Sequence, residues 1–229
     1  MKRFFISAFL IVLCAQSPLF SQRILLNAGF NKGKLFDFGN SDAPYNKEYH
    51  SAYGYQFGIQ LTDFMVDRKN SFRIGLSIEK YSGDFKTSYG EHFGSETHEG
   101  TFSKEVLGID FFPLNIKLKE NFHFSAGIHA NWVYAYSVTG TSSTTYFTDS
   151  SFHTIYRDLS TQSDFVTKKN IGLRLGLSYT LPIGSFFIQP SYYLHLGFKQ
   201  EFNSLDAPAK SFRQLFQIGV GYTFKKSKT

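Results

Sequence analysis

Residues 170–181, NIGLRLGLSYTL, alternate between apolar and small or polar side chains without one exception. The apolar positions are Ile171, Leu173, Leu175, Leu177, Tyr179 and Leu181, and the others are Asn170, Gly172, Arg174, Gly176, Ser178 and Thr180. A period of two over such a length predicts a β-strand, because successive side chains of a strand point to opposite faces. This strand should therefore have one wholly apolar face and one face of glycine, hydroxyl, amide and charged groups.

The same alternation recurs along the chain, in some segments less strictly. The further segments are 24–30, 53–61, 72–81, 106–113, 122–136, 186–198 and 212–224. The intervals between successive segments are alternately long and short, so all long connections should emerge on one side of an antiparallel meander. An even number of such strands can close into a barrel, which leaves no exposed sheet edge.

The apolar face of these strands must point out of the barrel. An eight-stranded barrel has an interior just wide enough for side chains to fill, so roughly forty large apolar groups, about five per strand, would not fit inside. An outward apolar face is favourable in a membrane, where every backbone polar group must pair within the protein. The predicted fold class is therefore all-β, an eight-stranded antiparallel up-and-down transmembrane β-barrel.

Aromatic residues are abundant, with 27 Phe and 14 Tyr among 229 residues. Those at strand ends would form the aromatic girdles that anchor a barrel at the two membrane interfaces. The predicted girdle on the side of the short turns comprises Phe72, Phe122, Phe186 and Phe224. The predicted girdle on the side of the long loops comprises Tyr53, Trp132, Tyr134, Tyr136 and Phe198.

The first residues have the layout of a secretory signal peptide. Lys2 and Arg3 precede an apolar run, residues 4–15, that is too short to span a bilayer as a helix. We expect cleavage after Ser21, which divides the chain into a signal peptide of residues 1–21 and an outer-membrane β-barrel domain of residues 22–229. The single cysteine, Cys14, lies in the signal peptide, so the mature protein should hold no thiol and no disulfide.

The charge pattern argues against a nucleic-acid partner. The chain has 24 Lys and Arg residues against 18 Asp and Glu residues, a net charge of +6. Both signs are spread along the chain, and the longest basic run is Lys225–Lys226. This is not the concentrated basic patch that nucleic-acid-binding proteins carry.

These features together resemble the small outer-membrane β-barrels of Gram-negative bacteria, the OmpX/OmpA-barrel type, over roughly residues 23–224. Such barrels end in a signal that the barrel-assembly machinery reads, polar-x-Gly-x-x-aromatic-x-aromatic. Gln217, Gly219, Tyr222 and Phe224 occupy its specified positions, although residues 225–229 follow the last aromatic residue. The Phe-rich composition and the FSQ cleavage region also resemble Bacteroidota barrels, including the secretion-associated PorT family.

The resemblance implies a place in the cell outer membrane after cleavage of the signal peptide. The implied partners are outer-membrane lipids, lipopolysaccharide and the barrel-assembly machinery, with envelope proteins as further candidates. Lys168, Lys169, Lys199 and Lys210 are near the expected outer rim, where they would meet lipopolysaccharide phosphates or act as ordinary solubilising charges.

The inward face of the predicted strands carries a polar network of charged and imidazole side chains. Its members are Arg73, Glu79, Asp110, His129, Arg174, His195 and Arg213, with His123 nearby. Unpaired buried charges cost several kcal/mol, so we expect these groups to pair and fill the lumen. A proton or ion path is the alternative, which an eight-stranded barrel disfavours because it leaves no aqueous channel.

Two prolines fall inside predicted strands of a barrel that has no free edge. Pro113 and Pro190 each remove a backbone donor, so we expect a bulge or irregular pairing at both.

The long loops are rich in Ser, Thr and Tyr, which suits surface contact. We therefore expect a non-enzymatic structural or surface-interaction protein without an open pore. One alternative is a subunit of an envelope or secretion complex of the PorT type. Another is a lipid A-modifying enzyme, because some small barrels use a His, a Ser and an acid near the outer rim. No catalytic, cofactor or metal site is predicted, since His92 and His98 with their neighbouring carboxylates match no tight ligand motif.

Overall fold

The computed structural model describes residues 23–37, 45–67, 70–91, 94–148, 151–161, 166–202 and 209–224. The predicted signal peptide lies outside these residues, so its cleavage stays a prediction. Within the described ranges, no helix is long and apolar enough to cross a membrane.

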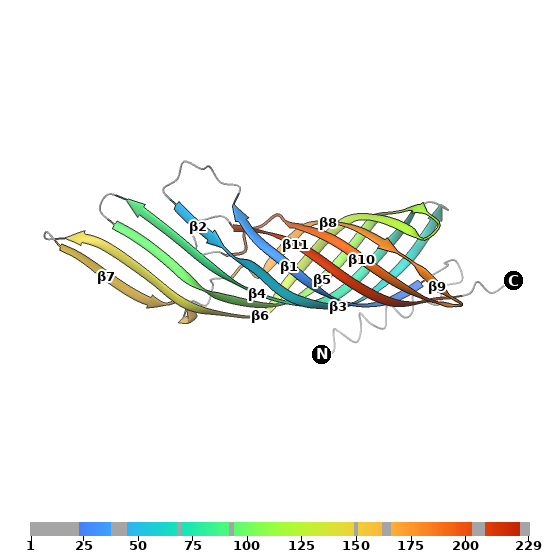
Figure 1. The fold of residues 1–229 in the computed structure, drawn as a ribbon, viewed down its shortest axis with the longest axis horizontal. Helices are drawn as coiled ribbons and strands as arrows, with labels where there is room; N and C mark the ends of the chain where they lie inside the picture. Colours follow the sequence, from blue (N-terminus) through green and yellow to red (C-terminus); the bar gives the residue numbers. More distant parts are fainter. Residues whose placement is uncertain are drawn as a thin grey trace.

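Eight antiparallel strands close into a ring, which confirms the predicted fold class (Figure 1). They are β1 (Arg23–Asp37), β3 (Ser51–Asp67), β4 (Asn70–Glu91), β5 (Gly94–Lys119), β6 (Phe122–Thr148), β8 (Lys169–Tyr179), β10 (Phe186–Gly197) and β11 (Ala209–Thr223). Each strand pairs with its neighbours in this order, and β11 pairs with both β10 and β1. A short strand, β9 (Leu181–Ile183), continues the line of β8 along β10.

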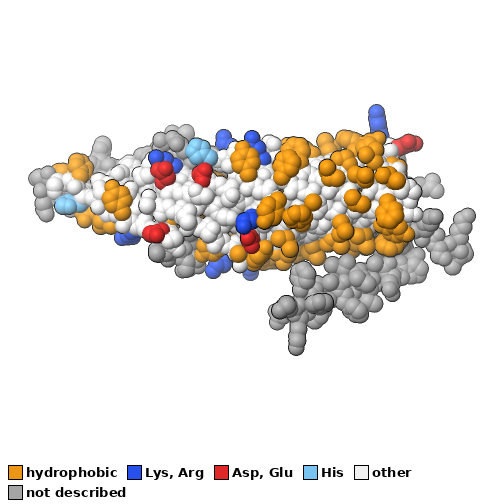
Figure 2. All heavy atoms as spheres, turned by 60° about the horizontal axis from the view of Figure 1, so that its bottom comes forward, with side chains coloured by type: hydrophobic (Ala, Val, Ile, Leu, Met, Phe, Trp, Pro, Cys, Tyr) orange, Lys and Arg blue, Asp and Glu red, His pale blue; other side chains and the backbone are white. Residues whose placement is uncertain are grey.

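The burial pattern confirms that the apolar face points outward. Leu26 and Ile218 keep 60% and 64% of their surface exposed, whereas Asn27 and Gln217 beside them are buried. In β8 the side chains at the even positions of 170–178 are all buried. Figure 2 shows hydrophobic side chains covering the ring strands on the visible face, with most charged side chains beyond them. The closed ring and its outward apolar belt make this a transmembrane barrel.

The prediction of long loops is wrong in part, because two of the predicted loops are paired hairpins. Strands β4 and β5 stay paired out to Glu91 and Gly94. Strand β6 runs on to pair with β7 (Ser151–Asp158), which ends at the short 3-10 helix η1 (Leu159–Thr161). Strand β2 (Tyr45–Tyr49) pairs with β4. These segments form an outer sheet, defined as β2, β7 and the distal parts of β4, β5 and β6, that projects from one end of the ring (Figure 1).

The sequence pattern missed these hairpins because the outer sheet has no lipid-facing side. Its residues therefore lack the strict apolar alternation of the ring. The Thr, Tyr and Phe residues of 138–158 nevertheless favour extended structure.

The two prolines disturb pairing in different ways. At Pro113 the register of β5 slips between Phe111 and Leu114, which confirms the predicted irregularity. Pro190 pairs with Ile218 of β11 without a slip, so no bulge forms there. On the other side of β10, Ser191 pairs with Ser178 of β8, and Ile188 pairs with Leu181 of β9. The positions between these two pairs, which include Pro190, form no pair on this side. The irregularity at Pro190 is thus confined to one of its two ladders.

A bulge in β6 overturns one girdle assignment. Glu105 of β5 pairs with Ala135 of β6, whereas the next residue, Val106, pairs with Val133. Strand β6 therefore has one extra residue between these two pairs. One extra residue in a strand reverses which side chains face inward beyond it. Tyr136 therefore packs inward rather than facing the outer membrane interface. It contacts the hydrophobic cluster inside the barrel, whose members are Leu35, Ala52, Tyr81, Phe85, Phe102, Val106, Val138, Leu159, Val166 and Phe202.

Candidate functional site

A buried ionic cluster occupies the lumen and centres on Glu79. Arg174 donates from Nη2 to Oε1 of Glu79 at 3.0 Å, and Arg213 donates from Nη1 to Oε2 of the same carboxylate. Arg174 also donates from Nη1 to Oδ2 of Asp110 at 2.8 Å. Two guanidinium groups thus face two carboxylates, which balances the charge in an interior where an unpaired ion would be costly.

Two histidines complete this cluster. His129 Nδ1 lies 2.8 Å from Oδ1 of Asp110, and its Nε2 lies 3.7 Å from Oε1 of Glu79. The ring of His195 meets that of His129 edge to face, with the centroids 4.9 Å apart. Side chains from β4, β5, β6, β8, β10 and β11 therefore meet across the lumen, which ties together strands that are not neighbours in the ring.

Arg73 lies apart from the other predicted members of the network. Its Nη1 donates to the Tyr193 hydroxyl at 2.6 Å and its Nη2 donates to Oδ1 of Asn115 at 3.3 Å. The guanidinium also lies 5.9 Å from the ring centroid of Phe112. The structure thus brings six of the seven predicted residues together and gives Arg73 a second cluster nearer the short turns.

A second ionic contact, which the sequence analysis missed, closes the lumen beside the outer sheet. Lys104 Nζ lies 2.7 Å from Oε2 of Glu201 and also donates to the Glu201 carbonyl at 2.9 Å. Tyr81 donates from its hydroxyl to the same carboxylate, and Asn170 Nδ2 donates to its other oxygen. Glu201 lies between β10 and β11, so this connection folds into the barrel rather than over it.

Burial alone would raise the pKa of the Glu201 carboxyl. The charge and hydrogen bond of Lys104, with smaller contributions from Ser211 and the charge of Arg213, together outweigh that effect, and the pKa falls to about 2. The carboxylate therefore remains ionised at neutral pH.

Aromatic rings pack around this contact. The rings of Phe85 and Phe102 each lie 5.3 Å from that of Phe202, and Lys104 Nζ lies 4.9 Å from the Phe202 ring centroid. We call Glu201 and Phe202 together with Lys104 the plug. The sequence held two signals for the plug. Lys104 is an even number of residues from the inward Asp110, so both side chains should lie on the same face of the strand. Phe202 is a large apolar residue in an otherwise polar connection.

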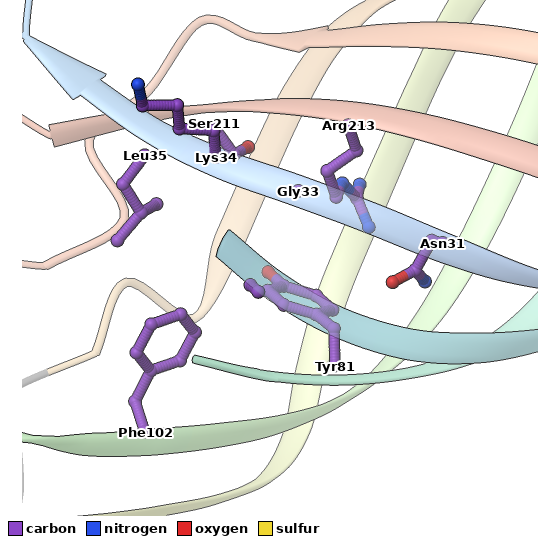
Figure 3. A pocket seen from close by; sticks show the side chains of 9 residues that line it. Asn31, Gly33, Lys34, Leu35, Tyr81, Phe102, Ser211 and Arg213 are labelled. Atoms are coloured by element: carbon purple, nitrogen blue, oxygen red, sulfur yellow. The ribbon is translucent and has the colours of Figure 1, made fainter. Parts of the chain in front are cut away.

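A small hollow lies beside Tyr81, Phe102 and Arg213, between the ionic cluster and the plug (Figure 3). Its volume is about 10 Å³. Such a volume is about that of a single water probe. The Arg213 guanidinium lies 5.0 Å from the Tyr81 ring centroid and so links the two levels.

The predicted barrel-assembly residues lie on both faces of β11. Gln217 faces inward and donates from Nε2 to Oε1 of Gln56 at 2.8 Å. Gly219 also faces inward, where a Cβ atom would overlap the side chain of Leu25. Tyr222 and Phe224 face outward with ring centroids 5.1 Å apart. Recognition of these residues by assembly machinery remains a prediction.

The predicted girdle residues lie at the strand ends but differ in exposure. Phe186, Phe198, Trp132 and Tyr134 are exposed on the outside of the ring. Phe72 and Phe122 are only partly exposed, and Phe72 stacks on Phe111 with the ring centroids 6.2 Å apart. Their role as membrane anchors is a proposal that rests on this placement.

An enzymatic site at the rim would need a His, a Ser and a carboxylate within hydrogen-bond reach. Ser151 Oγ lies 2.9 Å from Nε2 of His153, and Ser151 also donates to the Thr148 carbonyl. These residues belong to the tip of the β6–β7 hairpin, at the far end of the outer sheet from the ring (Figure 1). The pair is therefore distant from the membrane rim, where a lipid substrate would lie.

No protein-family model matches the chain, and no curated protein matches its sequence. Neisserial surface protein A is 12% identical, with a TM-score of 0.43, over 88% of this chain and 97% of that protein. The attachment invasion locus protein Ail of Yersinia pestis is 12% identical, with a TM-score of 0.37, over 89% and 99%. The outer membrane protein OprG of Pseudomonas aeruginosa is 11% identical, with a TM-score of 0.37, over 90% and 97%.

Proposed function

We propose that this protein is an integral outer-membrane β-barrel without an open pore, which acts by contacting partners at the cell surface through its outer sheet. The observation that carries the proposal is the division of the chain into two parts. The ring is filled by the ionic cluster and the plug, whereas strands of the same ring continue outward as paired hairpins.

The filled ring supports the closed state. Charged and imidazole side chains from six strands and an aromatic plug occupy the lumen, and an eight-stranded ring has no spare width for water to pass beside them. A solute would have to break buried ion pairs to cross, which is a large barrier.

The outer sheet supports a role in contact. All side chains of β7 are exposed, and they include Phe152, Ile155 and Tyr156. Large aromatic groups bury much area at little loss of conformational entropy, which suits binding surfaces. Paired hairpins also hold these groups in fixed positions, which unpaired loops would not do.

The membrane environment supplies the other proposed partners. Lys32, Lys169 and Lys199 are exposed where the apolar belt gives way to the outer sheet, and Lys32 Nζ lies 5.7 Å from the ring centroid of Tyr53. Exposed ammonium groups at this level suit the phosphates of lipopolysaccharide, while the belt meets the lipid chains. The barrel-assembly machinery is the proposed partner of the strand β11 signal.

Single-cysteine labelling tests the proposed orientation, because the one natural cysteine lies in the predicted signal peptide. Ser151→Cys in the β6–β7 hairpin should react with a membrane-impermeant maleimide on intact cells. The matched variant Ser185→Cys, in the turn between β9 and β10, should react only after the outer membrane is permeabilised. The reverse pattern would contradict the proposal. A crosslinking reagent attached to the cysteine of Ser151→Cys, followed by purification of the crosslinked complex, then identifies the partner.

A further inference from the structure

The β6–β7 hairpin has an open hollow beside the point at which β7 ends. Its volume is about 390 Å³, and it is lined by residues 139–141 of β6, residues 156–158 of β7 and Ser160 of η1. Pockets of about 300–1,000 Å³ are those in which proteins bind small ligands. The hollow therefore has room for a small molecule or for one unit of a polymer.

The pairing register places Tyr156 and Asp158 on one face of the hairpin, whereas Arg157, which pairs with Ser142, belongs to the other face. Thr141 pairs with Asp158, and Ser143 pairs with Tyr156. Directly paired residues of antiparallel strands share a face, and so do residues two positions apart. The other face carries Val138 and Ser142, which are buried. The hollow thus opens on the outer face of the hairpin, away from the hydrophobic cluster inside the barrel.

The chemistry of this face combines a flat aromatic surface with hydroxyl and carboxylate groups. Tyr156 is 74% exposed, so its ring is available to a ligand. Hydroxyl groups come from Thr139, Thr141 and Ser160. The backbone N–H of Ser160 donates to Oδ1 of Asp158 at 2.8 Å, which holds this carboxylate in place. A carboxylate has further lone pairs that can accept hydrogen bonds from a ligand.

Other ligand classes fit this lining less well. A calcium ion takes about six to eight oxygen ligands, often several carboxylates, and Asp158 is the one carboxylate among the described lining residues. A phosphate group prefers several cationic donors, and Arg157 is the one basic residue in the same set. A sugar ring offers an apolar face for the Tyr156 ring and several hydroxyl groups for the polar neighbours.

We propose that this hollow binds one pyranose unit of a glycan, with the apolar face of the sugar against the Tyr156 ring and its hydroxyl groups donating to the Asp158 carboxylate. The inference rests on the proposed function, because the hollow reaches a glycan only if the outer sheet lies outside the cell. It adds the class of ligand that one part of the outer sheet recognises.

The test is binding of the purified full-length protein, in detergent micelles, to an array of defined immobilised mono- and oligosaccharides. The wild-type protein should bind a subset of these sugars. Tyr156→Ala should reduce the signal at least tenfold, whereas Tyr156→Phe keeps the ring and should retain most of it. Asp158→Asn should weaken binding less than Tyr156→Ala. The matched control is Tyr146→Ala, which removes an aromatic residue from the opposite face of the same hairpin and should leave binding unchanged.

The inference is overturned if the wild-type protein binds no sugar on the array, or if Tyr146→Ala and Tyr156→Ala reduce binding equally. Labelling of Ser151→Cys on intact cells separates this failure from failure of the proposed function. Surface labelling without sugar binding would contradict the glycan site but not the proposed orientation. Absence of surface labelling would sink the proposed orientation, whatever the array shows.

Discussion

Lys104 Nζ lies 2.7 Å from Oε2 of Glu201 inside the barrel, where the two side chains keep 0% and 4% of their surface exposed. The contact joins strand β5 to a segment 97 positions further along the chain. It closes the lumen beside the outer sheet, while the cluster around Glu79 closes it deeper in the ring. The closed state proposed for this barrel depends on these two levels together.

Replacing Glu201 by Gln should destabilise the barrel strongly. The change leaves the Lys104 ammonium buried without its counter-charge, which typically costs about 3–5 kcal/mol. The free energy of unfolding in urea, measured in detergent micelles, checks this. The matched control is Glu105→Gln, which breaks the partly exposed pair between Lys80 and Glu105 and should cost less than about 1 kcal/mol. Equal losses for the two variants would contradict a buried, structural ion pair.

The stabilising effect of Glu201 should vanish in acid. Its folded-state pKa of about 2 lies below the ordinary value of 4.5, so its contribution is fully present above pH 4.5. That contribution is lost as the pH falls from 4.5 towards 2, because in this window the unfolded state binds a proton that the folded state does not yet bind. The difference in free energy of unfolding between wild type and Glu201→Gln should therefore shrink across this window. A difference that stays constant from pH 6 to pH 2 would show that the carboxylate charge contributes nothing.

Gly221 should tolerate no large side chain. A Cβ atom at this position would overlap the ring of Phe187, which fills the lumen near the short turns. Gly221→Leu should therefore cost about 1–3 kcal/mol through overpacking. The penalty should be smaller in a Phe187→Ala background, which a double-mutant cycle measures. Val220→Leu, on the lipid-facing side of the same strand, is the near-neutral control. Additive effects of Gly221→Leu and Phe187→Ala would count against the inward position of both.

Loss of the terminal aromatic groups should slow assembly. Phe224→Ala and Tyr222→Ala remove the outward rings of the proposed assembly signal, so less barrel should reach the heat-modifiable folded form in cells. The control is Ile218→Ala, which removes an exposed apolar group from the same strand without touching the signal. Pulse-labelling followed by unheated gel electrophoresis gives the folded fraction. If all three variants assemble equally fast, the signal assignment is wrong.

The architecture of the ring is predictable from sequence because one physical constraint acts on every strand. Lipid requires apolar groups outside and the narrow lumen requires small or paired polar groups inside, so residues such as Ile171 and Arg174 take opposite faces. The inward position of Glu79, Asp110, Arg174 and Arg213 follows from the same alternation. Which of them pair with each other does not, because pairing across the lumen depends on strand stagger, which alternation leaves open.

Beyond the membrane this constraint does not act, so the alternation of apolar residues no longer predicts which segments form strands. The hairpins of the outer sheet resemble polar loops because neither face meets lipid. The plug was missed for a related reason: Glu201 is an ordinary residue of a polar connection until that connection folds inward to meet Lys104. Tyr136 faces inward because of the bulge near Tyr134. The sequence does not predict this bulge, because one extra residue hardly changes the pattern of an aromatic-rich stretch.

Single-channel recording in planar bilayers tests the central proposal most directly. The purified wild-type protein, inserted at neutral pH, should give no stable open conductance, because the cluster around Glu79 and the plug at Glu201 both fill the lumen. Glu201→Ala should by itself give at most brief openings, since the deeper cluster remains in place. A stable, long-lived open conductance from the wild-type protein would contradict the closed barrel.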